Sequence, residues 1–173
     1  MLQRDYQTQT CSIARSLENV GERWTILILR NVFLGWRRFD EQQRQLGIAR
    51  NVLAARLQRL VDEQILELRP YGERPVRHEY HLTEKGRALW PVLAELLQWG
   101  DRYAPEPAGP PRIFRHKECG GLMGAHLICE RCGQWLDSED VISELGPGAG
   151  AGARRLQKTR RAPERAAPAS ASA

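Results

Sequence analysis

The stretch Gly47-Ile-Ala-Arg-Asn-Val-Leu-Ala-Ala-Arg-Leu-Gln-Arg-Leu-Val61 decides the predicted fold. Its apolar residues recur at helical period and so share one face of a helix; they are Leu53, Leu57, Leu60 and Val61. The opposite face has no acidic residue and comprises Asn51, Ala54, Ala55 and Gln58, with Arg50 and Arg59 on its flanks. Such a face can lie in a DNA major groove, where Ala permits close approach and Asn or Gln pairs with adenine. An ordinary solvent-exposed helix is the alternative.

The segments before this helix are also predicted to be helical. A short helix over about Phe39–Leu46 is separated from it by Gly47, and this order is that of a helix-turn-helix. Upstream we expect a helix over Ser12–Val20 with Ser12 as its N-cap, and another over about Glu22–Leu34. The second of these is apolar over much of its circumference, which places it in the core.

A β-hairpin is predicted directly after this helix-turn-helix. Apolar and polar residues alternate over Leu66–Arg69 and Val76–Thr83, on either side of Pro70–Pro75. A hairpin in this place is a wing, so the fold class is mainly α with a small β-hairpin wing. Basic residues near its tip can contact phosphates, although a solvated tip is the alternative. The candidate DNA-binding residues are Arg38, Arg50, Asn51, Ala55, Gln58, Arg59, Arg74 and Arg77.

A long helix over about Glu84–Tyr103, capped by Thr83, is predicted to follow the wing. Its apolar residues cover a broad arc; they are Leu89, Val92, Leu93, Leu96, Leu97 and Trp99. A winged unit of this size is too small to bury the whole arc, so we expect the excess to pack against a second subunit. The alternative is that the arc closes the core of the monomer.

The charge of the chain is unevenly distributed. Hydrophobic residues make up 42% of the 173 residues, enough for a packed core, and the formal net charge is +5. Residues 146–173 account for that excess, with six basic side chains against Glu164. Residues 30–60 carry seven arginines against Asp40 and Glu41, which favours a nucleic-acid partner. There is neither a run of 18 apolar residues nor a secretory signal, so we expect a cytoplasmic protein without membrane contact.

Several short motifs occur together in a specific order. They are Cys11, Gly21-Glu-Arg-Trp-Thr-Ile-Leu-Ile-Leu-Arg30, Arg37-Arg-Phe39, Gly47-Ile48, Val52-Leu53, Arg56-Leu57, Arg77-His-Glu-Tyr80, Leu82-Thr-Glu-Lys-Gly86 and Trp99-Gly100. With them the chain resembles the HxlR-type winged helix-turn-helix regulators, relatives of the MarR group. The resemblance implies a dimeric transcription regulator, not an enzyme, that binds an inverted-repeat operator and most often represses an adjacent gene.

The chain departs from that family at the start of the recognition helix. Many members have Ser-Pro there, whereas this chain has Ala49-Arg50. The missing Ser cap costs about 1 kcal/mol of helix-end stability, and it leaves the base preference open.

Cys11 lies where several members of the family keep a thiol that senses oxidants or electrophiles. The positive end of the following helix dipole stabilises a thiolate at this position. A packed structural cysteine is the alternative. Because the winged domain has no second cysteine, a switch would need Cys11 of the partner subunit, a small-molecule thiol or a reactive electrophile.

The other three cysteines belong to a motif beyond a proline-rich linker at residues 104–112. It reads His116-x2-Cys119, then nine residues, then Cys129-x2-Cys132. Two pairs of soft ligands suit tetrahedral structural zinc and predict a miniature zinc-ribbon-like module over residues 113–145. Three alternatives remain: His126 as the fourth ligand, a Cys129/Cys132 redox pair, and a metal-free hairpin. Some members of the resembling family share such a C-terminal extension.

Residues 146–173 are rich in Gly, Ala, Pro and Arg, so we expect a disordered basic tail. Its arginines would add sequence-independent DNA affinity, or the tail has no role. The predicted domains are a flexible N-terminus at 1–10, a DNA-binding and dimerisation domain at 11–103, the linker at 104–112, the module at 113–145 and the tail at 146–173.

The leading functional hypothesis is a regulator whose partners are a double-stranded DNA operator, a second copy of the chain and a small-molecule or oxidant effector. Two alternatives centre on the C-terminal cysteines. One is a thiol oxidoreductase, which lacks an accompanying nucleotide loop or acid–base cluster. The other is a protein-interaction adaptor.

Overall fold

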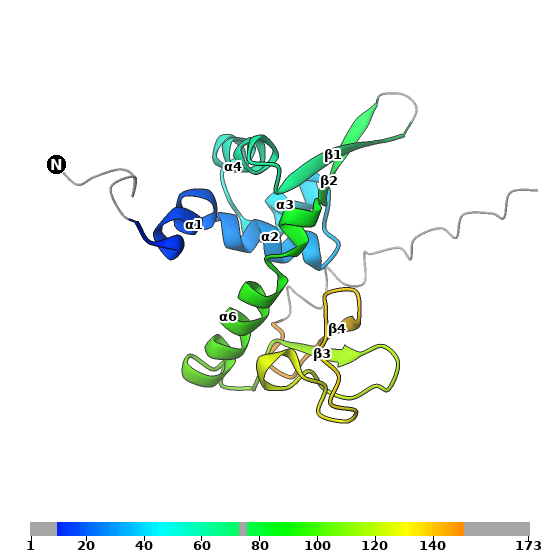
Figure 1. The fold of residues 1–173 in the computed structure, drawn as a ribbon. Coiled ribbons are helices and arrows are strands. Elements are labelled where there is room, and N and C mark those ends of the chain that lie inside the picture. Colours follow the sequence, from blue (N-terminus) through cyan, green and yellow to red (C-terminus); the bar gives the residue numbers. More distant parts are fainter. Residues whose placement is uncertain (1–9, 73–75, 151–173) are drawn as a thin grey trace, which may run out of the picture.

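The computed structural model describes residues 10–72 and 76–150, with helix α2 (Thr25–Phe33) at the centre of the N-terminal half (Figure 1). Its residues Ile28, Leu29 and Val32 are almost completely buried, as the apolar circumference of this segment predicted. The helix is shorter than expected, because residues 22–24 form a turn that precedes it.

Helix α1 covers Ser12–Val20, the predicted range, but its cap differs from the prediction. Cys11, with extended backbone, is its N-cap, and the assignment of the cap to Ser12 was wrong. The first carbonyl that accepts a helical hydrogen bond is that of Cys11, which bonds the amide of Arg15. Ser12 is therefore the first residue of the helix itself.

The predicted helix-turn-helix is confirmed. Helix α3 (Phe39–Leu46) ends at Gly47, whose left-handed backbone (φ 61°) turns the chain into helix α4 (Arg50–Asp62). Ala49 caps α4 without a side-chain hydrogen bond, as expected from the absence of a Ser at this position. Glu41 stabilises the start of α3 by accepting hydrogen bonds from the backbone amides of Arg37 (3.1 Å) and Arg38 (2.9 Å).

Two buried amides, which the sequence pattern did not predict, fix α3 on α2. Asn31 and Gln42 are both fully buried. Nδ2 of Asn31 donates to Oε1 of Gln42 over 3.0 Å, and Nε2 of Gln42 donates to the carbonyl of Trp36 over 2.8 Å. Oδ1 of Asn31 accepts from both Nε and Nη2 of Arg30, at 3.1 and 2.8 Å. Buried polar groups are tolerated because each finds a partner.

The wing is an antiparallel hairpin of β1 (Leu66–Tyr71) and β2 (Arg77–Leu82). Strand β1 continues through Pro70, so it is longer than the predicted strand. The amide of Tyr80 donates to the carbonyl of Arg37 over 2.8 Å and ties the wing to the α2–α3 connection. Arg74 lies outside the described residues.

The predicted long helix is divided into α5 (Glu84–Arg87) and α6 (Trp90–Tyr103). Thr83 caps α5 as predicted, since its Oγ1 accepts from the amide of Gly86 over 3.1 Å. The division follows from Pro91, which has no N–H to donate and is tolerated only in the first turn of a helix. The chain therefore changes direction here, and α6 starts anew.

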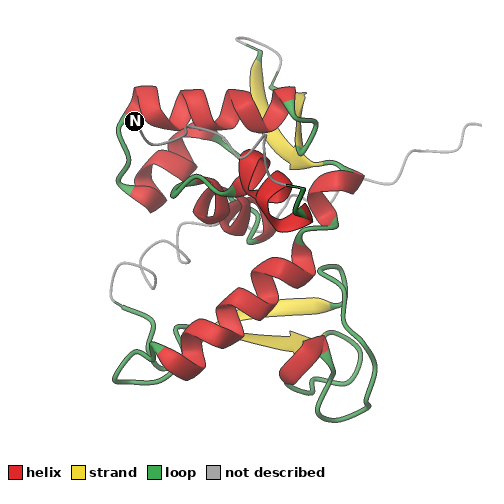
Figure 2. Cartoon of the chain, turned by 60° about the vertical axis from the view of Figure 1, so that its left-hand side comes forward, coloured by secondary structure: helices red, strands yellow, loops and turns green. Residues whose placement is uncertain are grey.

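The C-terminal module is built on an antiparallel hairpin of β3 (Arg112–His116) and β4 (Val141–Leu145), with a 3-10 turn at Ala125–Leu127 between them. Strand β4 was not predicted from the sequence. Figure 2 shows α6 lying along this hairpin. The ring of Trp90 lies between those of Phe33 and Phe114, with centroids 5.6 Å away on each side. The module therefore packs directly on α6 and is not connected to the winged domain through the linker alone.

The first residues of the predicted tail are part of the fold, which corrects the expected boundary at residue 146. Gly146 and Ala149 are buried. The amide of Gly146 donates to the carbonyl of Pro111 over 3.0 Å, which extends the β3–β4 pairing into the linker. The rest of the tail, 151–173, lies outside the described residues, as does 1–9. None of the helices within 10–72 and 76–150 combines the length and apolar character needed to cross a bilayer.

We expect Gln42→Ala to lower the free energy of unfolding by about 2 kcal/mol, because it leaves buried polar groups of Asn31 and Trp36 without partners. Urea denaturation at one fixed protein concentration measures this change. Gln58→Ala is the matched control: Gln58 is exposed and bonds only Asp62, so its effect should stay within about 0.5 kcal/mol. Equal effects of the two variants would contradict the role given to the buried amides.

Candidate nucleic-acid interface and metal centre

The face of α4 that was predicted to be exposed is exposed. Leu53, Leu57 and Leu60 are buried against α2 and the wing base. The opposite side carries the four exposed residues Asn51, Ala54, Ala55 and Gln58. Figure 1 shows α4 and the wing on the side of the molecule that faces away from the C-terminal module. The arrangement leaves a small-residue, amide-bearing helix face beside a projecting hairpin.

The arginines that flank this face differ in how firmly the fold holds them. Arg50 is exposed, with its guanidinium over the ring of Phe39 at 4.8 Å. Arg59 is also exposed, but its Nη2 donates to the carbonyl of Glu18 in α1 over 2.6 Å. Arg77 lies exposed at the start of β2. Arg59 is thus held toward α1, whereas Arg50 packs on Phe39 of α3.

Arg38 joins α3 to the wing. Its Nε lies 2.9 Å from Oε1 of Glu79, and its guanidinium covers the ring of Tyr71 at 4.2 Å. The hydrogen bond with Glu79 raises the pKa of Arg38. Burial alone would raise the pKa of Glu79, but the hydrogen bonds from Arg38 and His81 lower it overall. Glu79 thus stays ionised and holds Arg38 in place.

Tyr71 and Glu79, which contact Arg38, were not predicted as parts of this interface. Both lie on the wing, and Glu79 pairs with Arg69 across the two strands. The signal was present in the alternation of β2, because Glu79 is an acidic residue among Arg77, His78 and His81. Only the folded hairpin brings it to Arg38, 41 positions earlier in the chain.

A second surface is apolar and lies on α6. Val92, Leu96, Trp99 and Tyr103 recur at helical spacing, and each is between 51% and 61% exposed. Their opposite face, with Leu93 and Ala94, is buried. The apolar arc predicted for this helix therefore has two parts. Its inner part closes the core of the monomer, as the alternative prediction stated. Its outer part is uncovered in the described chain. Ile13 and Leu17 of α1 are exposed as well.

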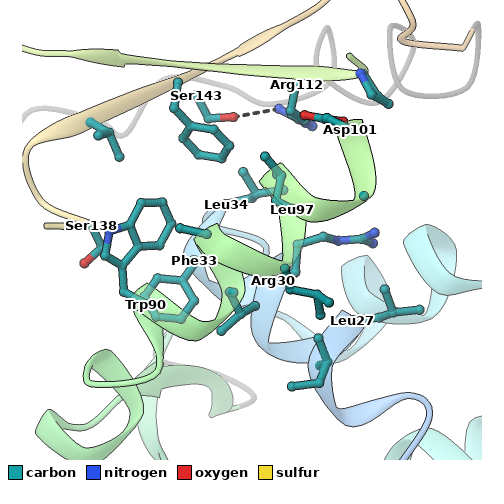
Figure 3. Close-up of a pocket in the computed structure, with 18 of the residues that line it drawn as sticks. Leu27, Arg30, Phe33, Leu34, Trp90, Leu97, Asp101, Arg112, Ser138 and Ser143 are labelled. Carbon is teal, nitrogen blue, oxygen red and sulfur yellow. Dashed lines mark hydrogen bonds between the residues drawn. The ribbon is translucent and has the colours of Figure 1, made fainter. Parts of the chain in front are cut away.

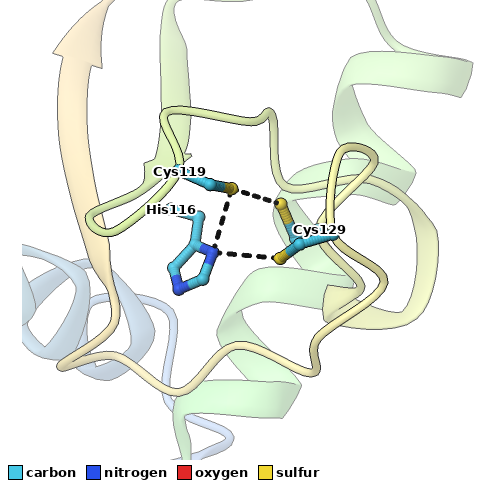
Figure 4. A group of neighbouring side chains, drawn as sticks. His116, Cys119 and Cys129 are labelled. Atoms are coloured by element: carbon cyan, nitrogen blue, oxygen red, sulfur yellow. Dashed lines mark hydrogen bonds between the residues drawn. The ribbon is translucent and has the colours of Figure 1, made fainter.

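The four predicted metal ligands converge at the end of the β3–β4 hairpin (Figure 4). The ligand atoms of His116, Cys119, Cys129 and Cys132 all lie within 4.8 Å of one another. Nδ1 of His116 is 3.2 Å from Sγ of Cys119 and 3.3 Å from Sγ of Cys132. Ligand atoms around a tetrahedral zinc ion are separated by about 3.5–3.8 Å. The group can therefore bind a metal ion.

The two ligand pairs have the same local structure. In each, the glycine after the second ligand donates its amide to the carbonyl of the first, from Gly120 to His116 and from Gly133 to Cys129, both over 2.9 Å. Both glycines have positive φ, 72° and 74°, which side chains other than Gly rarely adopt. The sequence motif therefore builds two equivalent knuckles that face each other.

The surroundings of Cys129 favour its thiolate. Desolvation alone would raise its pKa, but hydrogen bonds from the backbone amides of Cys132 and Arg131 and from neighbouring thiols lower it to about 6. Thiolate is the form that binds a metal. His126, the alternative ligand, lies outside the group: it is 87% exposed and its Nδ1 is 3.5 Å from Oε1 of Glu95.

Comparisons with known proteins agree with this architecture. A family model described as HxlR-like helix-turn-helix matches residues 19–108. The chain is 49% identical over 137 residues to the HTH-type transcriptional regulator Rv3095 of Mycobacterium tuberculosis, covering 79% of this chain and 87% of that protein. The solved structure of PA1607, described as a candidate transcription factor, is 36% identical with a TM-score of 0.63 and covers 78% of this chain and 94% of its own. That of the HTH-type regulator ytcD is 28% identical, with a TM-score of 0.51 over 55% of this chain and 98% of its own.

We expect the purified chain to contain about one zinc ion per molecule, measured by inductively coupled plasma mass spectrometry. His116→Ala and Cys129→Ser should each abolish stoichiometric zinc, because three ligands hold the ion far less well than four. His126→Ala is the matched control and should keep it. A metal-free chain that forms a reversible Cys129–Cys132 disulfide would instead support the redox-pair interpretation.

Proposed function

The chain belongs to the HxlR-like helix-turn-helix family of transcriptional regulators, and we propose that it binds an inverted-repeat DNA operator as a homodimer and represses an adjacent gene. Members of this family are transcriptional regulators and not enzymes, which removes the thiol oxidoreductase hypothesis. The observation that carries the proposal is the exposed, amide-bearing face of α4 next to the wing.

In this proposal α4 enters the major groove. Asn51 and Gln58 contact base edges, and Ala55 lets the helix approach closely. Arg50, Arg59 and Arg38 contact the phosphates beside the groove, and Arg74 and Arg77 do so from the wing; such contacts set orientation and affinity more than base preference. The absence of acidic side chains from the exposed α4 face between Arg50 and Arg59 supports this placement.

The proposed dimer interface is the exposed stripe of α6 together with α1. Large apolar side chains recurring on one exposed helix face mark an interaction surface. Rings of Trp99 and Tyr103 lie 5.5 Å apart on this stripe and would form the centre of the contact. A two-fold dimer presents two copies of α4 to two half-sites, which matches an inverted repeat.

We propose that the Cys/His group holds structural zinc. The four ligands are closed around one point and two of them, His116 and Cys129, are buried, as in structural sites that keep no open position. The module supports α6 through Leu127 and the hydrogen bond from Nε1 of Trp90 to the carbonyl of Leu136 (3.1 Å). We propose residues 11–103 as the DNA-binding and dimerisation domain, 104–112 as the linker and 113–145 as the module, to which residues 146–149 are added because Gly146 and Ala149 are buried.

Cys11 is the candidate for redox sensing. It is exposed and is the N-cap of α1, so an oxidant or electrophile can reach its thiol, and modification would alter a helix of the proposed dimer interface. This placement favours the sensing role over that of a packed structural cysteine. Diamide treatment should weaken operator binding by the parent chain and leave that of Cys11→Ser unchanged, as measured by fluorescence anisotropy.

We expect Asn51→Ala and Gln58→Ala each to weaken operator binding by about tenfold, because a lost base contact costs about 1–3 kcal/mol. Arg77→Ala should weaken binding to all sequences alike and lower the salt slope by about one. A genome-wide binding map supplies the operator, and fluorescence anisotropy at several salt concentrations measures the affinity.

Lys117→Ala is the control for this assay, since Lys117 is an exposed cation on the module, away from α4. It should bind the operator like the parent chain. Should Asn51→Ala and Gln58→Ala also bind like the parent, the assignment of α4 as the recognition helix is wrong.

We expect Trp99→Asp to convert the dimer into a monomer and to weaken operator binding together with it, because a charge on the apolar stripe must be desolvated at the interface. Sedimentation equilibrium gives the mass. Trp135→Asp is the matched control: Trp135 is 50% exposed, against 59% for Trp99, but lies on the module. A Trp99→Asp chain that remains dimeric would exclude α6 as the interface.

A further inference from the structure

A cleft of about 640 Å³ lies where α2, α6 and the β3–β4 hairpin meet (Figure 3). Neither the proposed operator contacts nor the metal group uses it. Its volume is in the range of sites that bind small molecules, which are about 300–1,000 Å³. The cleft exists only because the module packs on α6, so it belongs to the complete chain and not to the winged domain alone.

One part of the cleft is aromatic. Phe33 of α2, Trp90 of α6 and Phe114 of β3 line it, and their rings contact in sequence at 5.6 Å between centroids. Leu34 and Leu97 continue the apolar surface (Figure 3). Trp90 is itself buried between the other two rings, so the half-buried Phe33 and Phe114 offer the aromatic surface against which another flat ring can pack.

The polar part of the cleft carries two arginines from different elements. Arg30 of α2 donates to Asn31, and Arg112 of β3 donates to Oγ of Ser143 over 3.2 Å. Burial lowers the pKa of Arg30, and the positive charge of Arg112 lowers it further. The guanidinium of Arg112 also lies over the ring of Trp36 at 5.6 Å. An anion that enters the cleft can accept hydrogen bonds from the two guanidinium groups in addition to the partners they already have.

The acidic residues of the lining limit the charge of that anion. Asp101 and Glu106 both line the cleft. Burial raises the pKa of Asp101, and Glu106 is exposed. They offset part of the charge of Arg30 and Arg112, so a singly charged carboxylate fits the site better than a doubly charged phosphate.

We propose that this cleft is a binding site for a small aromatic monocarboxylate, with its ring on the half-buried Phe33, Leu97 and Phe114 and its carboxylate between Arg30 and Arg112. Guanidinium groups recognise carboxylates through paired hydrogen bonds. The bound carboxylate would compete with Oδ1 of Asn31 for Arg30, and Asn31 bonds Gln42 of α3. Any effect on the operator rests on the proposed function, whereas binding of the carboxylate does not.

Isothermal titration calorimetry of the full, metal-loaded chain with 2-naphthoate tests the site, and 2-naphthamide is the neutral isostere. We expect saturable binding of one 2-naphthoate per chain and at least about tenfold weaker binding of 2-naphthamide. Arg30→Gln and Arg112→Gln should each weaken 2-naphthoate binding by about tenfold and leave 2-naphthamide unchanged. Asp101→Asn should strengthen it.

Arg115→Gln is the matched control, because Arg115 lies on β3 but pairs with Glu144 outside the cleft; it should bind 2-naphthoate like the parent chain. Two results would each overturn the proposal. One is the absence of saturable 2-naphthoate binding. The other is equal affinity for 2-naphthoate and 2-naphthamide that Arg112→Gln does not change. Binding that appears only when Trp99→Asp disrupts the dimer would show that a second copy occupies the cleft, and this also overturns it. Arg112→Gln should still bind the operator, so either proposal can fail without the other.

Discussion

The position of the recognition helix depends on the buried hydrogen bonds between Asn31 and Gln42. Helix α3 is mostly polar and has little apolar surface with which to hold itself on α2. Gln42 supplies the specific contact, since it reaches both Asn31 and the carbonyl of Trp36. Leaving such a group unsatisfied costs about 1–3 kcal/mol, a large share of a marginal folding free energy of about 5–15 kcal/mol. Because α4 follows α3 after a short turn, the same bonds orient α4 and its exposed face.

Helix α6 has an equally central place, because three parts of the molecule meet on it. Leu93 belongs to the core of the winged domain, and Trp90 and Ala94 belong to the core shared with the module. The outer stripe with Leu96 and Trp99 is the surface proposed for dimerisation. A metal ion in the Cys/His group would hold the module against the inner face and so keep the outer face in place. Metal, cleft and dimer surface are therefore connected through one helix, and Leu96 belongs to both the cleft lining and the proposed dimer surface.

The elements that the sequence predicted well are those whose signal is local. The helical period of the apolar residues and the glycine between the two helices located α3 and α4. The alternation of apolar and polar residues located the two strands of the wing. The spacing of His116, Cys119, Cys129 and Cys132 identified the group that the fold brings together. Two predictions were wrong because neighbouring residues fit the same local pattern. The N-cap of α1 is Cys11 and not Ser12. Pro91 divides a segment whose apolar spacing predicted one continuous helix. The strand β4 was missed because its partner β3 lies 25 residues or more earlier in the chain.

The sequence by itself determined the winged helix-turn-helix, the exposed side of α4 and the four convergent ligands. These features depend on helical period and on the spacing of ligands in a knuckle, and both are set by residues only a few positions apart. Only the tertiary structure decided which arginines the fold holds, as with Arg38 on Glu79 and Arg59 on Glu18. It also decided that the module packs on Trp90 and that Arg30 and Arg112 line one cleft. These pairings join residues 40 or more positions apart, and their free energy comes from burial and charge in a shared environment that no local pattern records.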